Sequence, residues 1–545
     1  MSKVAHYLQE HLTGEILTNA NVRRYFSTDG GVFAVTPSLV VYPRNENDIR
    51  KTARFTWQLA ERGRVIPITA RGLGTDQAGA AIGSGIMMVF PAHMNRILEF
   101  DGKTGQVIIE PGINYGKLQQ TLHTHGRFLP PYPSSIEFST LGGAIANNAA
   151  GEKTVKYGNT RDYTKGLRVV LANGEVIETK RISKRELSKK MGLATFEGEI
   201  YRALDALIEE NEKAIKSMKL GVTKNSAGYA LDLVKQKDGS FDLTPLLAGS
   251  QGTLGIITEA TLSTEVHNPQ TTLIAAFFDD IKTAEQIVHE LRNFPDMPSA
   301  MEVVDDNLLN FLAEHHPNKL KGLVEKPFPR LVVLIEFDSA NMRLQKRMAK
   351  KAQKLLEKHA VKYQIESEES EKEKLWSIRH SAAAVISHSE GNMKALPIIE
   401  DGIVPNERFH DYLKAVYEIF DKYNLRVALW GHAGNANLHM QPFLDLSQIG
   451  DRQKVFKVID DYYQMVIGMG GSTSGEHSDG RLRAPYLKQL YGEQVYGLFQ
   501  KVKQIFDPYG TLNPGVKIDV TIDDIKPLLR HEYSMEHLMD HLPRS

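Results

Sequence analysis

Three glycine-rich segments, of which the first and third adjoin apolar stretches typical of strands, constrain the fold of this chain most strongly. They are residues 71–79 (RGLGTDQAG), 139–151 (STLGGAIANNAAG) and 247–260 (LAGSQGTLGIITEA). Closely spaced glycines let backbone N–H groups converge on an anion such as a phosphate, and small side chains let a flat cofactor approach the backbone. Surface or tightly packed turns give the same pattern, and none of the three is the GxGxxG of a nicotinamide-binding unit. A cofactor domain is favoured, without the cofactor being named.

The first glycine-rich segment follows a predicted β-α-β unit. Residues 39–43 (LVVYP) and 64–70 (RVIPITA) are short and apolar, as buried strands are. Between them, residues 48–62 have apolar side chains at helical spacing, and Asn45 or Asn47 precedes them as a candidate N-cap.

Composition limits the class of protein. At 545 residues the chain is too long for one ordinary core, so we expect two domains or more. A formal net charge of zero argues against nucleic acid as a partner. The chain has no cysteine, which excludes disulfides, thiolate metal sites and cysteine-ligated iron–sulfur clusters.

The N-terminal residues are polar and lack the apolar core of a signal peptide, and no apolar run approaches the ~20 residues needed to span a bilayer. We therefore expect a cytoplasmic protein. Peripheral contact with the inner membrane and formation of a homodimer are left open.

The strongest chemical signal lies between residues 429 and 480. Two histidines, His432 and His439, lie seven residues apart in WGHAGNANLH, and Glu476-His477 follows in a second glycine-rich loop, STSGEHSDG. Two imidazoles and a carboxylate suffice to hold a divalent metal with one position open. A lone histidine is more often a core residue, and an odd spacing points the two in opposite directions along a simple strand. The glycines indicate a loop that brings both inward.

The middle of the chain alternates strands and helices, which predicts an α+β layer packed on the cofactor domain. Strands are expected at residues 273–278 and 331–337, and helices at 281–294 and 343–359. The acidic cluster at 366–373 is expected to be the solvated start of a helix that carries Trp376, Arg379 and His380.

Several motifs in the same order carry a family resemblance. ARGLGTDQAG, STLGGAIANNAAG, YGNTRDYTKGLRVVLANGEVI and GSQGTLGIITEATL resemble the FAD-binding domain of the vanillyl-alcohol oxidase, or p-cresol methylhydroxylase (PCMH)-type, flavoprotein family. With WGHAGNANLH, TSGEHSDG and FDPYGTLNPGVK the chain looks like the branch that oxidises D-2-hydroxy acids. That branch includes D-lactate and D-2-hydroxyglutarate dehydrogenases and glycolate oxidase flavoprotein subunits.

The resemblance implies an α+β fold with a two-part PCMH-type FAD-binding domain, an α+β cap domain and a C-terminal helical segment that returns to the flavin domain. We expect an N-terminal segment at residues 1–35, the FAD-binding domain at 36–265, the cap (substrate) domain of the FAD-linked oxidase C-terminal type at 266–490 and the return segment at 491–545. The tail after Lys517 has no assigned role, and its scattered histidines (His531, His537, His541) are not expected to bind metal.

The resemblance also implies which residues contact FAD. They are Arg71, Gly72, Leu73, Gly74, Thr75, Asp76, Gln77, Pro133, Ser139, Thr140, Gly142, Gly143, Asn147, Gly151, Gly252, Gly255, Ile257 and Asn513. Some relatives attach FAD through a histidine near the first loop. No histidine occurs between Gln58 and Pro91, and His93 lies beyond the loop, so we expect non-covalent FAD.

For the substrate side, the resemblance implies His432, His439 and Glu476 as metal ligands and His477 as the base. By ligand type Zn²⁺, Mn²⁺ and Fe²⁺ all fit, and zinc is the ion we expect. Arg379 would bind the substrate carboxylate, since a guanidinium fork matches two carboxylate oxygens. Lys394 and Asn437 are further substrate-contact candidates. A surface salt bridge is the alternative role for both, and it is favoured for Lys394 but not for Arg379.

The expected reaction is oxidation of a D-lactate-like D-2-hydroxy acid to the 2-oxo acid, with the hydroxyl proton taken by His477 and hydride passed to flavin N5. An unidentified acceptor (quinone, cytochrome or electron-transfer flavoprotein) would reoxidise the flavin. Two alternatives on the same scaffold are the non-redox chemistry of alkylglycerone-phosphate synthase and an FAD-binding companion subunit without turnover. The first predicts a basic phosphate pocket and no metal triad, and fold alone does not choose among them.

Overall fold

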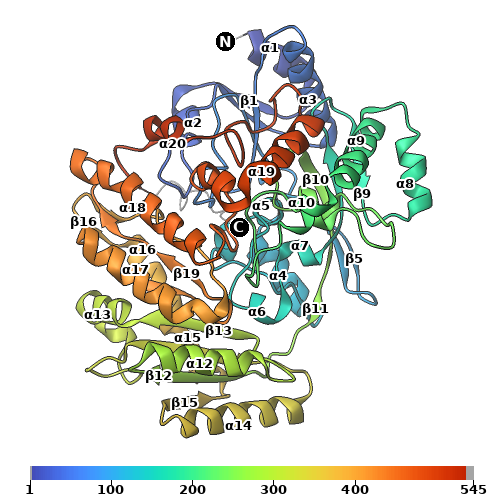
Figure 1. Ribbon diagram of the computed structural model, residues 1–545. Helices are drawn as coiled ribbons and strands as arrows, with labels where there is room; N and C mark the ends of the chain where they lie inside the picture. Colours follow the sequence, from blue (N-terminus) through green and yellow to red (C-terminus); the bar gives the residue numbers. More distant parts are fainter. Residues whose placement is uncertain (1–2, 535–545) are drawn as a thin grey trace.

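A computed structural model describes residues 3–534, without the side chains of residues 383–384, 387 and 389–390. The chain forms two parts, seen one above the other in Figure 1, where residues up to about 266 and the C-terminal segment make the upper part. His537 and His541 lie outside the described residues.

The upper part begins with a small four-stranded sheet in which three neighbouring strands are parallel and the first strand is antiparallel to them. Its order is β1-β2-β4-β3, formed by Glu15–Leu17, Leu39–Tyr42, Ile86–Val89 and Ile68–Arg71. Helix α3 (Glu46–Ala60) connects β2 to β3, and the Asn45 side chain caps it by accepting from the Asp48 N–H. The predicted β-α-β unit is therefore present, with β4 inserted between its two strands.

A second, antiparallel sheet continues the upper part. Its order is β5-β6-β10-β8-β9, formed by Ile97–Asp101, Gln106–Ile109, Ile256–Ser263, Thr164–Val170 and Val176–Thr179. The pair β11 (Glu265–Val266) and β7 (Arg127–Phe128) lies where the chain leaves for the lower part. The remaining helices of this part are α1 (Lys3–His11), α2 (Ala20–Tyr25), α4 (Tyr115–Thr124), α5 (Leu141–Asn147), α6 (Thr154–Tyr157), α7 (Thr160–Tyr163), α8 (Lys184–Met191), α9 (Phe196–Glu210), α10 (Glu212–Lys216) and α11 (Thr244–Leu247).

The lower part, which we call the cap, is a six-stranded antiparallel sheet with helices on both faces. Its order is β15-β12-β14-β13-β18-β19, formed by Lys362–Glu366, Thr272–Phe278, Leu331–Phe337, Ala300–Asp305, Leu429–His432 and Asn437–Met440. Helices α12 (Ile281–Arg292), α14 (Met342–Lys358), α17 (Phe409–Tyr423) and α18 (Ile449–Gly468) share a core with one face. Helices α13 (Asp306–His315), α15 (Glu369–His380) and α16 (Ala382–Ser387) cover the other, beside the short sheet β16 (Ser389–Glu390), β17 (Met393–Ala395) and β20 (Phe443–Leu444).

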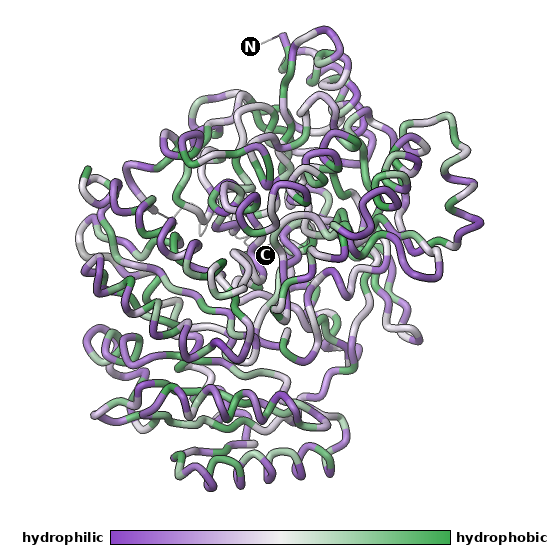
Figure 2. Tube along the Cα trace, in the orientation of Figure 1, coloured by the Kyte–Doolittle hydropathy of each residue, from purple (hydrophilic) through white to green (hydrophobic). Residues whose placement is uncertain are grey.

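Burial on both faces explains why the central cap strands are apolar throughout. Along β14, Val333 and Ile335 face one core while Val332 and Leu334 face the other. Such strands lose the alternation of a half-exposed strand and read as continuous apolar runs. In Figure 2 the sheet strands run mainly green, whereas the outer helix α14 alternates green and purple.

The chain finally returns from the cap to the upper part. Helix α19 (Leu487–Phe506) is kinked at Gly492, and Val495, Leu498 and Phe499 join the core of the upper part. After it, Ile68 and the segment 511–513 exchange backbone hydrogen bonds. The last helix is α20 (Ile522–Ile525).

Most predicted elements are present with shifted ends. The strand predicted at 64–70 begins only at Ile68, because Pro67 cannot donate to a strand pairing. The predicted strand 331–337 has its expected bounds, and the helix predicted at 343–359 runs from Met342 to Lys358. Among the described residues, no helix has the length and apolar character needed to cross a membrane.

Candidate active site

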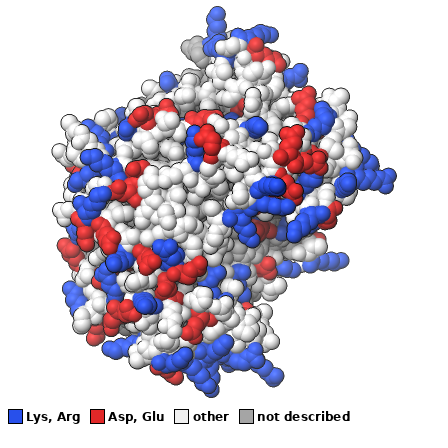
Figure 3. Space-filling view, viewed as in Figure 1, with Lys and Arg blue, Asp and Glu red and all other residues white. Residues whose placement is uncertain are grey.

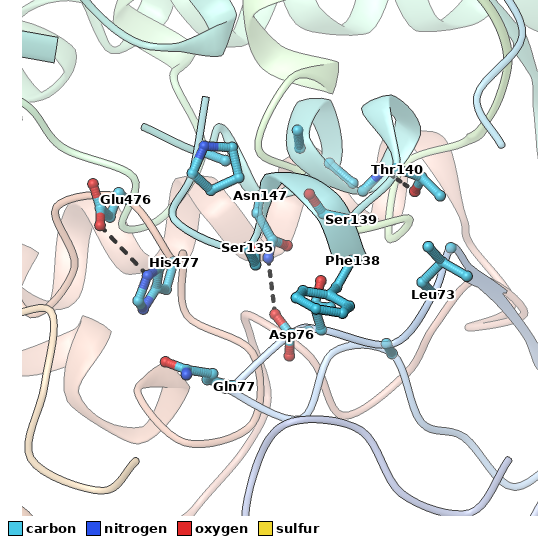
Figure 4. Close-up of a pocket in the computed structure, with 18 of the residues that line it drawn as sticks. Leu73, Asp76, Gln77, Ser135, Phe138, Ser139, Thr140, Asn147, Glu476 and His477 are labelled. Atoms are coloured by element: carbon cyan, nitrogen blue, oxygen red, sulfur yellow. Dashed lines mark hydrogen bonds and ion pairs between the residues drawn. The ribbon is translucent and has the colours of Figure 1, made fainter. Parts of the chain in front are cut away.

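A cavity of about 840 Å³ lies between the upper part and the cap. All predicted FAD contacts except Asn513 line it, and so do Arg379, His432, His439, Glu476 and His477. Figure 4 shows His477 and Glu476 at one end, with Asp76, Asn147, Ser139 and Thr140 further along. The structure therefore brings the predicted cofactor and substrate residues to one continuous space.

The glycine-rich loops leave polar and open surface toward this space. Ser139 Oγ and Arg71 Nε are buried without a hydrogen-bond partner among the described residues. Gly252 has φ +72°, and a Cβ there would meet only the Ala70 Cβ, at 3.9 Å. An elongated cavity walled by backbone and small residues fits a dinucleotide such as FAD.

Acidic groups also stand beside the first loop. Asp76 accepts hydrogen bonds from the N–H groups of Ala78 and Ala80 and from Asn147 Nδ2. Burial, together with the nearby Asp76 carboxylate, raises the pKa of Asp29 to about 7. The Arg71 guanidinium donates to the carbonyls of Thr28 and Ala81 and so ties these loops together.

Two residues considered for cofactor contact lie elsewhere. Asn513 sits behind the cavity wall, where its Nδ2 donates to the Ala80 and Gln251 carbonyls and its Oδ1 accepts from Thr69. It braces the loops that line the cavity. His93 bonds to Glu15 at 2.7 Å and is not a lining residue.

A tight hairpin explains how the two histidines face the same way. Strands β18 and β19 pair with Trp430 opposite His439 and His432 opposite Asn437. Opposite residues of an antiparallel pair share a face, so His439 lies on the same face as Trp430. His432, two residues after Trp430, lies on that face as well, although seven residues separate the two histidines. The expected inward placement of His432 and His439 is what the structure shows.

Three imidazoles converge on one oxygen of Glu476. Its Oε1 lies 3.0 Å from His439 Nε2, 3.2 Å from His432 Nε2 and 3.5 Å from His477 Nε2. A tetrahedral zinc ion with bonds of about 2.0–2.1 Å holds its ligand atoms about 3.3 Å apart. The distances from Glu476 Oε1 to His432 Nε2 and to His439 Nε2 are therefore of the size found between two ligands of one small divalent cation.

Asp401 organises the loop that carries Glu476 and His477. Its carboxylate accepts from the backbone N–H groups of both residues and from the Ser474 hydroxyl. Possible ligand atoms of Asp401, His439, Glu476 and His477 lie within 4.8 Å of one another. With so many donors to satisfy, Asp401 fits a loop anchor better than a fourth ligand.

Two buried glutamates that sequence reasoning missed orient the histidines. Glu302 on β13 lies 2.7 Å from His432 Nδ1, and Glu400 lies 3.3 Å from His439 Nδ1 and 2.8 Å from His477 Nδ1. A carboxylate at Nδ1 accepts the N–H there, so Nε2 is the ring nitrogen turned to the cavity, and once deprotonated it can bind a metal or take a substrate proton. The one available signal was an acid inside an apolar stretch, in AMEVVD and PIIED.

The charges of these groups shift their pKa values strongly. Burial alone would raise the pKa of Glu400, but the His477 and Arg483 cations hold it well below its usual range. Burial would likewise lower the pKa of His477, and the Glu400 and Asp401 carboxylates instead raise it well above 6.5. His477 is thus a group that binds a proton readily.

Arg379 enters the cavity from α15 and is anchored by the same Glu302. Its Nε donates to Glu302 Oε2 at 2.9 Å, and among the described residues its remaining guanidinium nitrogens have no hydrogen-bond partner. The side chain is 7% exposed. A buried guanidinium with free N–H groups is suited to bind a carboxylate.

The other two substrate candidates do not line the cavity. Lys394 lies on β17 in the short sheet beside it, opposite Leu444. Asn437 is fully buried and donates to the carbonyls of Asp401 and Gly402. Gln441, which sequence reasoning missed, does line the cavity, and its Oε1 is buried without a partner.

Two family models match the chain. The model described as "FAD binding domain" matches residues 37–180, and "FAD linked oxidases, C-terminal domain" matches residues 267–516. Together they span the first two glycine-rich segments, Arg379 and the His-Glu cluster, though not the third glycine-rich segment.

Curated relatives cover nearly the whole chain. This chain is 30% identical over 526 residues to D-2-hydroxyglutarate dehydrogenase of Escherichia coli (strain K12), and the match covers 93% of this chain and 50% of that protein. It is also 30% identical over 482 residues to glycolate oxidase subunit GlcD of Bacillus subtilis (strain 168), covering 88% of each. The chain spans about half the length of the D-2-hydroxyglutarate dehydrogenases that it matches.

Solved structures share the fold. p-Cresol methylhydroxylase with substrate bound superposes with a TM-score of 0.69 at 14% identity, covering 96% of this chain and 97% of that one. Alkyldihydroxyacetonephosphate synthase superposes with a TM-score of 0.62 at 17% identity, covering 94% and 86%. With these matches to sequences and folds, the chain belongs to the PCMH-type family of FAD-linked oxidases, in the branch of the 2-hydroxy acid dehydrogenases.

Proposed function

We propose that this chain is an FAD- and metal-dependent dehydrogenase of D-2-hydroxy acids such as D-lactate. One observation carries the proposal. A single cavity is lined by the FAD loops at one end and by Arg379, three imidazoles and Glu476 at the other. This arrangement supports a carboxylate-binding role for Arg379, a proton-accepting role for an imidazole and a cation site, all beside the cofactor loops.

In this proposal Arg379 orients the substrate. Its free guanidinium N–H groups bind the substrate carboxylate, while Glu302 keeps the side chain from rotating. His432, His439 and Glu476 would hold a divalent metal, with zinc favoured, whose positive charge lowers the pKa of the substrate hydroxyl.

His477 is the proposed base. Glu400 holds its Nδ1, so Nε2 faces the cavity and accepts the hydroxyl proton. When bound, FAD supplies the two-electron acceptor for the Cα hydrogen that leaves as hydride, which yields the 2-oxo acid. Burial of Glu400, Arg379 and His439 keeps water from competing with these contacts. The electron acceptor that reoxidises the flavin is proposed to be a quinone, a cytochrome or an electron-transfer flavoprotein.

The two alternatives predict a different site. Ether-lipid chemistry of the alkylglycerone-phosphate synthase type needs a basic phosphate pocket, whereas this end of the cavity holds Glu400, Glu476 and three histidines. A companion subunit without turnover needs no oriented base. The carboxylate at His477 Nδ1 therefore favours an active enzyme.

Anaerobic reduction of the purified flavoprotein by a panel of D- and L-2-hydroxy acids tests the proposal. We expect one D-acid to bleach the flavin absorbance, and expect chelation or H477A to abolish the bleaching. H93A serves as the matched control, because that histidine bonds to Glu15 outside the cavity. A flavin- and metal-loaded protein that no 2-hydroxy acid bleaches would overturn the proposal.

A further inference from the structure

A segment of the upper part reaches across to both loops of the candidate cation site. It comprises residues 223–228, between α10 and the short turn at Leu231–Leu233, and we call it the brace. Asn435 Nδ2 donates to Thr223 Oγ1 at 2.8 Å, and Ser472 Oγ donates to Asn225 Oδ1 at 2.8 Å. The Ser226 N–H donates to the Ser474 carbonyl at 3.1 Å. Three residues of the brace thus fix the loops on which His432 and Glu476 stand.

The brace also contributes one charged side chain to the site. Lys224 Nζ lies 2.7 Å from Glu476 Oε2, and the two side chains are 1% and 5% exposed. Glu476 Oε1 faces His432, His439 and His477. The two oxygens of one carboxylate therefore have different partners, a cation on one side and the imidazoles on the other.

This division has consequences for any cation held at Oε1. An ammonium group at 2.7 Å from Oε2 occupies that oxygen, so the carboxylate offers the cation one oxygen. In a buried setting the Lys224 charge also offsets much of the carboxylate charge, because no bulk water screens the pair. A cation bound to a partly neutralised ligand set retains more of its own positive charge.

We propose that Lys224 is a positioning residue of this site, which holds Glu476 as a one-oxygen ligand and keeps the bound cation electrophilic toward the substrate hydroxyl. The inference rests on the proposed metal site and adds to it a residue outside both histidine motifs. Groups around a metal's direct ligands typically change affinity or activity by about 10–100-fold when replaced.

The test uses Co²⁺ as a probe in the flavin-loaded protein, where its visible bands at wavelengths beyond the flavin absorption weaken as coordination number rises. In K224M, Glu476 is free to offer both oxygens. We expect weaker Co²⁺ bands at full occupancy and a kcat for the bleaching D-acid lowered by about 10–100-fold with a smaller change in KM. K224R keeps the charge and should keep the wild-type bands.

K517M is the matched control. Lys517 is equally buried and pairs at 2.7 Å with Asp479, three residues after Glu476, but it contacts no proposed ligand. We expect K517M to lower stability without altering the Co²⁺ bands. If K224M does not fold, K224Q takes its place, because it keeps a donor to Oε2 without the charge. The same fall in kcat is expected for K224Q.

The outcomes distinguish failure of the metal site from failure of the role of Lys224. Wild-type protein that binds no Co²⁺ at the site would overturn the metal site itself and this inference with it. Normal bands in wild type together with unchanged bands and kcat in K224M would overturn the role of Lys224 alone.

Discussion

At the scale of single residues, the site depends on carboxylates that each contact several nitrogen groups. Glu400 is 1% exposed and contacts His439, His477 and the fully buried Arg483. A buried carboxylate is costly unless it is paired and hydrogen-bonded. Because three partners share it, the orientation of each imidazole depends on the same group, and Glu302 plays the same part for His432 and Arg379.

Glu302→Gln tests this dependence. One amide nitrogen replaces an oxygen, so either His432 Nδ1 or Arg379 Nε loses its acceptor. We expect metal affinity to fall by about 10–100-fold, and KM for the acid to rise because Arg379 is less firmly held. Chelator competition and steady-state kinetics measure the two effects. Unchanged values for both would show that Glu302 has no positioning role.

Asp305 lies on β13 with Glu302, and its buried carboxyl group predicts how the stability of the protein depends on pH. Burial raises the pKa of Asp305 from 3.8 to about 7, while its Oδ1 accepts from the Leu308 and Leu429 N–H groups. A folded-state pKa above the unfolded value means that the folded protein retains the proton longer. Stability from this group is therefore lost as pH rises from about 4 to about 7, by on the order of 4 kcal/mol.

Asp305→Asn removes that loss. The amide oxygen keeps both backbone bonds, and the amide nitrogen donates to Tyr417 Oη. We expect the thermal midpoint of the variant to exceed that of wild type at pH 8, and the difference to shrink toward pH 5. Glu186→Gln, at an exposed capping box, is the control. A difference that is independent of pH would contradict the assignment.

Residue types and motif order predicted the parts of the site that lie close in sequence. Two glycine-rich segments hold these residues, which are His432, His439, Glu476 and His477. Their chemistry could therefore be predicted from the sequence motifs alone. Glu302 and Lys224 could not be found this way. Glu302 joins the site only because β13 pairs with β18, which sets it opposite His432 more than a hundred residues away. Long-range strand register is not encoded in any local pattern.

At the scale of elements, periodicity was informative where one face of a helix is buried and less so for strands. Helix α14 was predicted almost to its ends because its buried residues recur at helical spacing. Strand β13 was missed, since AMEVVD is short and contains two acids. The β18–β19 hairpin was expected only as a loop that brings both histidines inward.

Repulsion between basic side chains lowers the stability of helix α14. Its solvent face presents Arg343, Lys346, Arg347, Lys350, Lys351, Lys354 and Lys358, with Glu357 the one acid of the helix. These side chains form part of the basic band along the lower edge in Figure 3. Like charges at i,i+4 destabilise a helix, and a cation in the first turn opposes its dipole.

Arg343→Glu should relieve both effects. An acid in the first turn favours the dipole and pairs with Lys346 and Arg347 one turn later. We expect a local stabilisation of about 0.5–1 kcal/mol. Hydrogen exchange of the α14 amides, compared with Arg343→Gln, measures it. Exchange as fast as in wild type would refute the prediction.

At the scale of the whole molecule, a buried ionic cluster joins the upper part to the cap. Lys153 and Lys156, at and within α6, meet Glu336 and Asp338 at the end of β14, and Lys156 also pairs with Asp296 at 3.1 Å. The Tyr157 hydroxyl donates to Asp338 at 2.9 Å. Lys153 follows Gly151 and Glu152 of the cavity wall, so this cluster fixes the cap relative to the cofactor loops.

Lys153→Met should therefore lower the stability of the protein and weaken the attachment of the cap to the upper part. Removing one partner of a buried pair leaves an uncompensated charge on Glu336, at a cost of about 3–5 kcal/mol. We expect flavin release on heating to begin at a lower temperature and to separate from the unfolding of the cap, because the two parts no longer open together. The double variant Lys153→Met, Glu336→Leu should recover much of the loss, since a packed apolar pair often replaces a buried ion pair without penalty. If flavin release and cap unfolding still coincide in the single variant, the two parts are held together by their apolar contacts and the ionic cluster only sets their register.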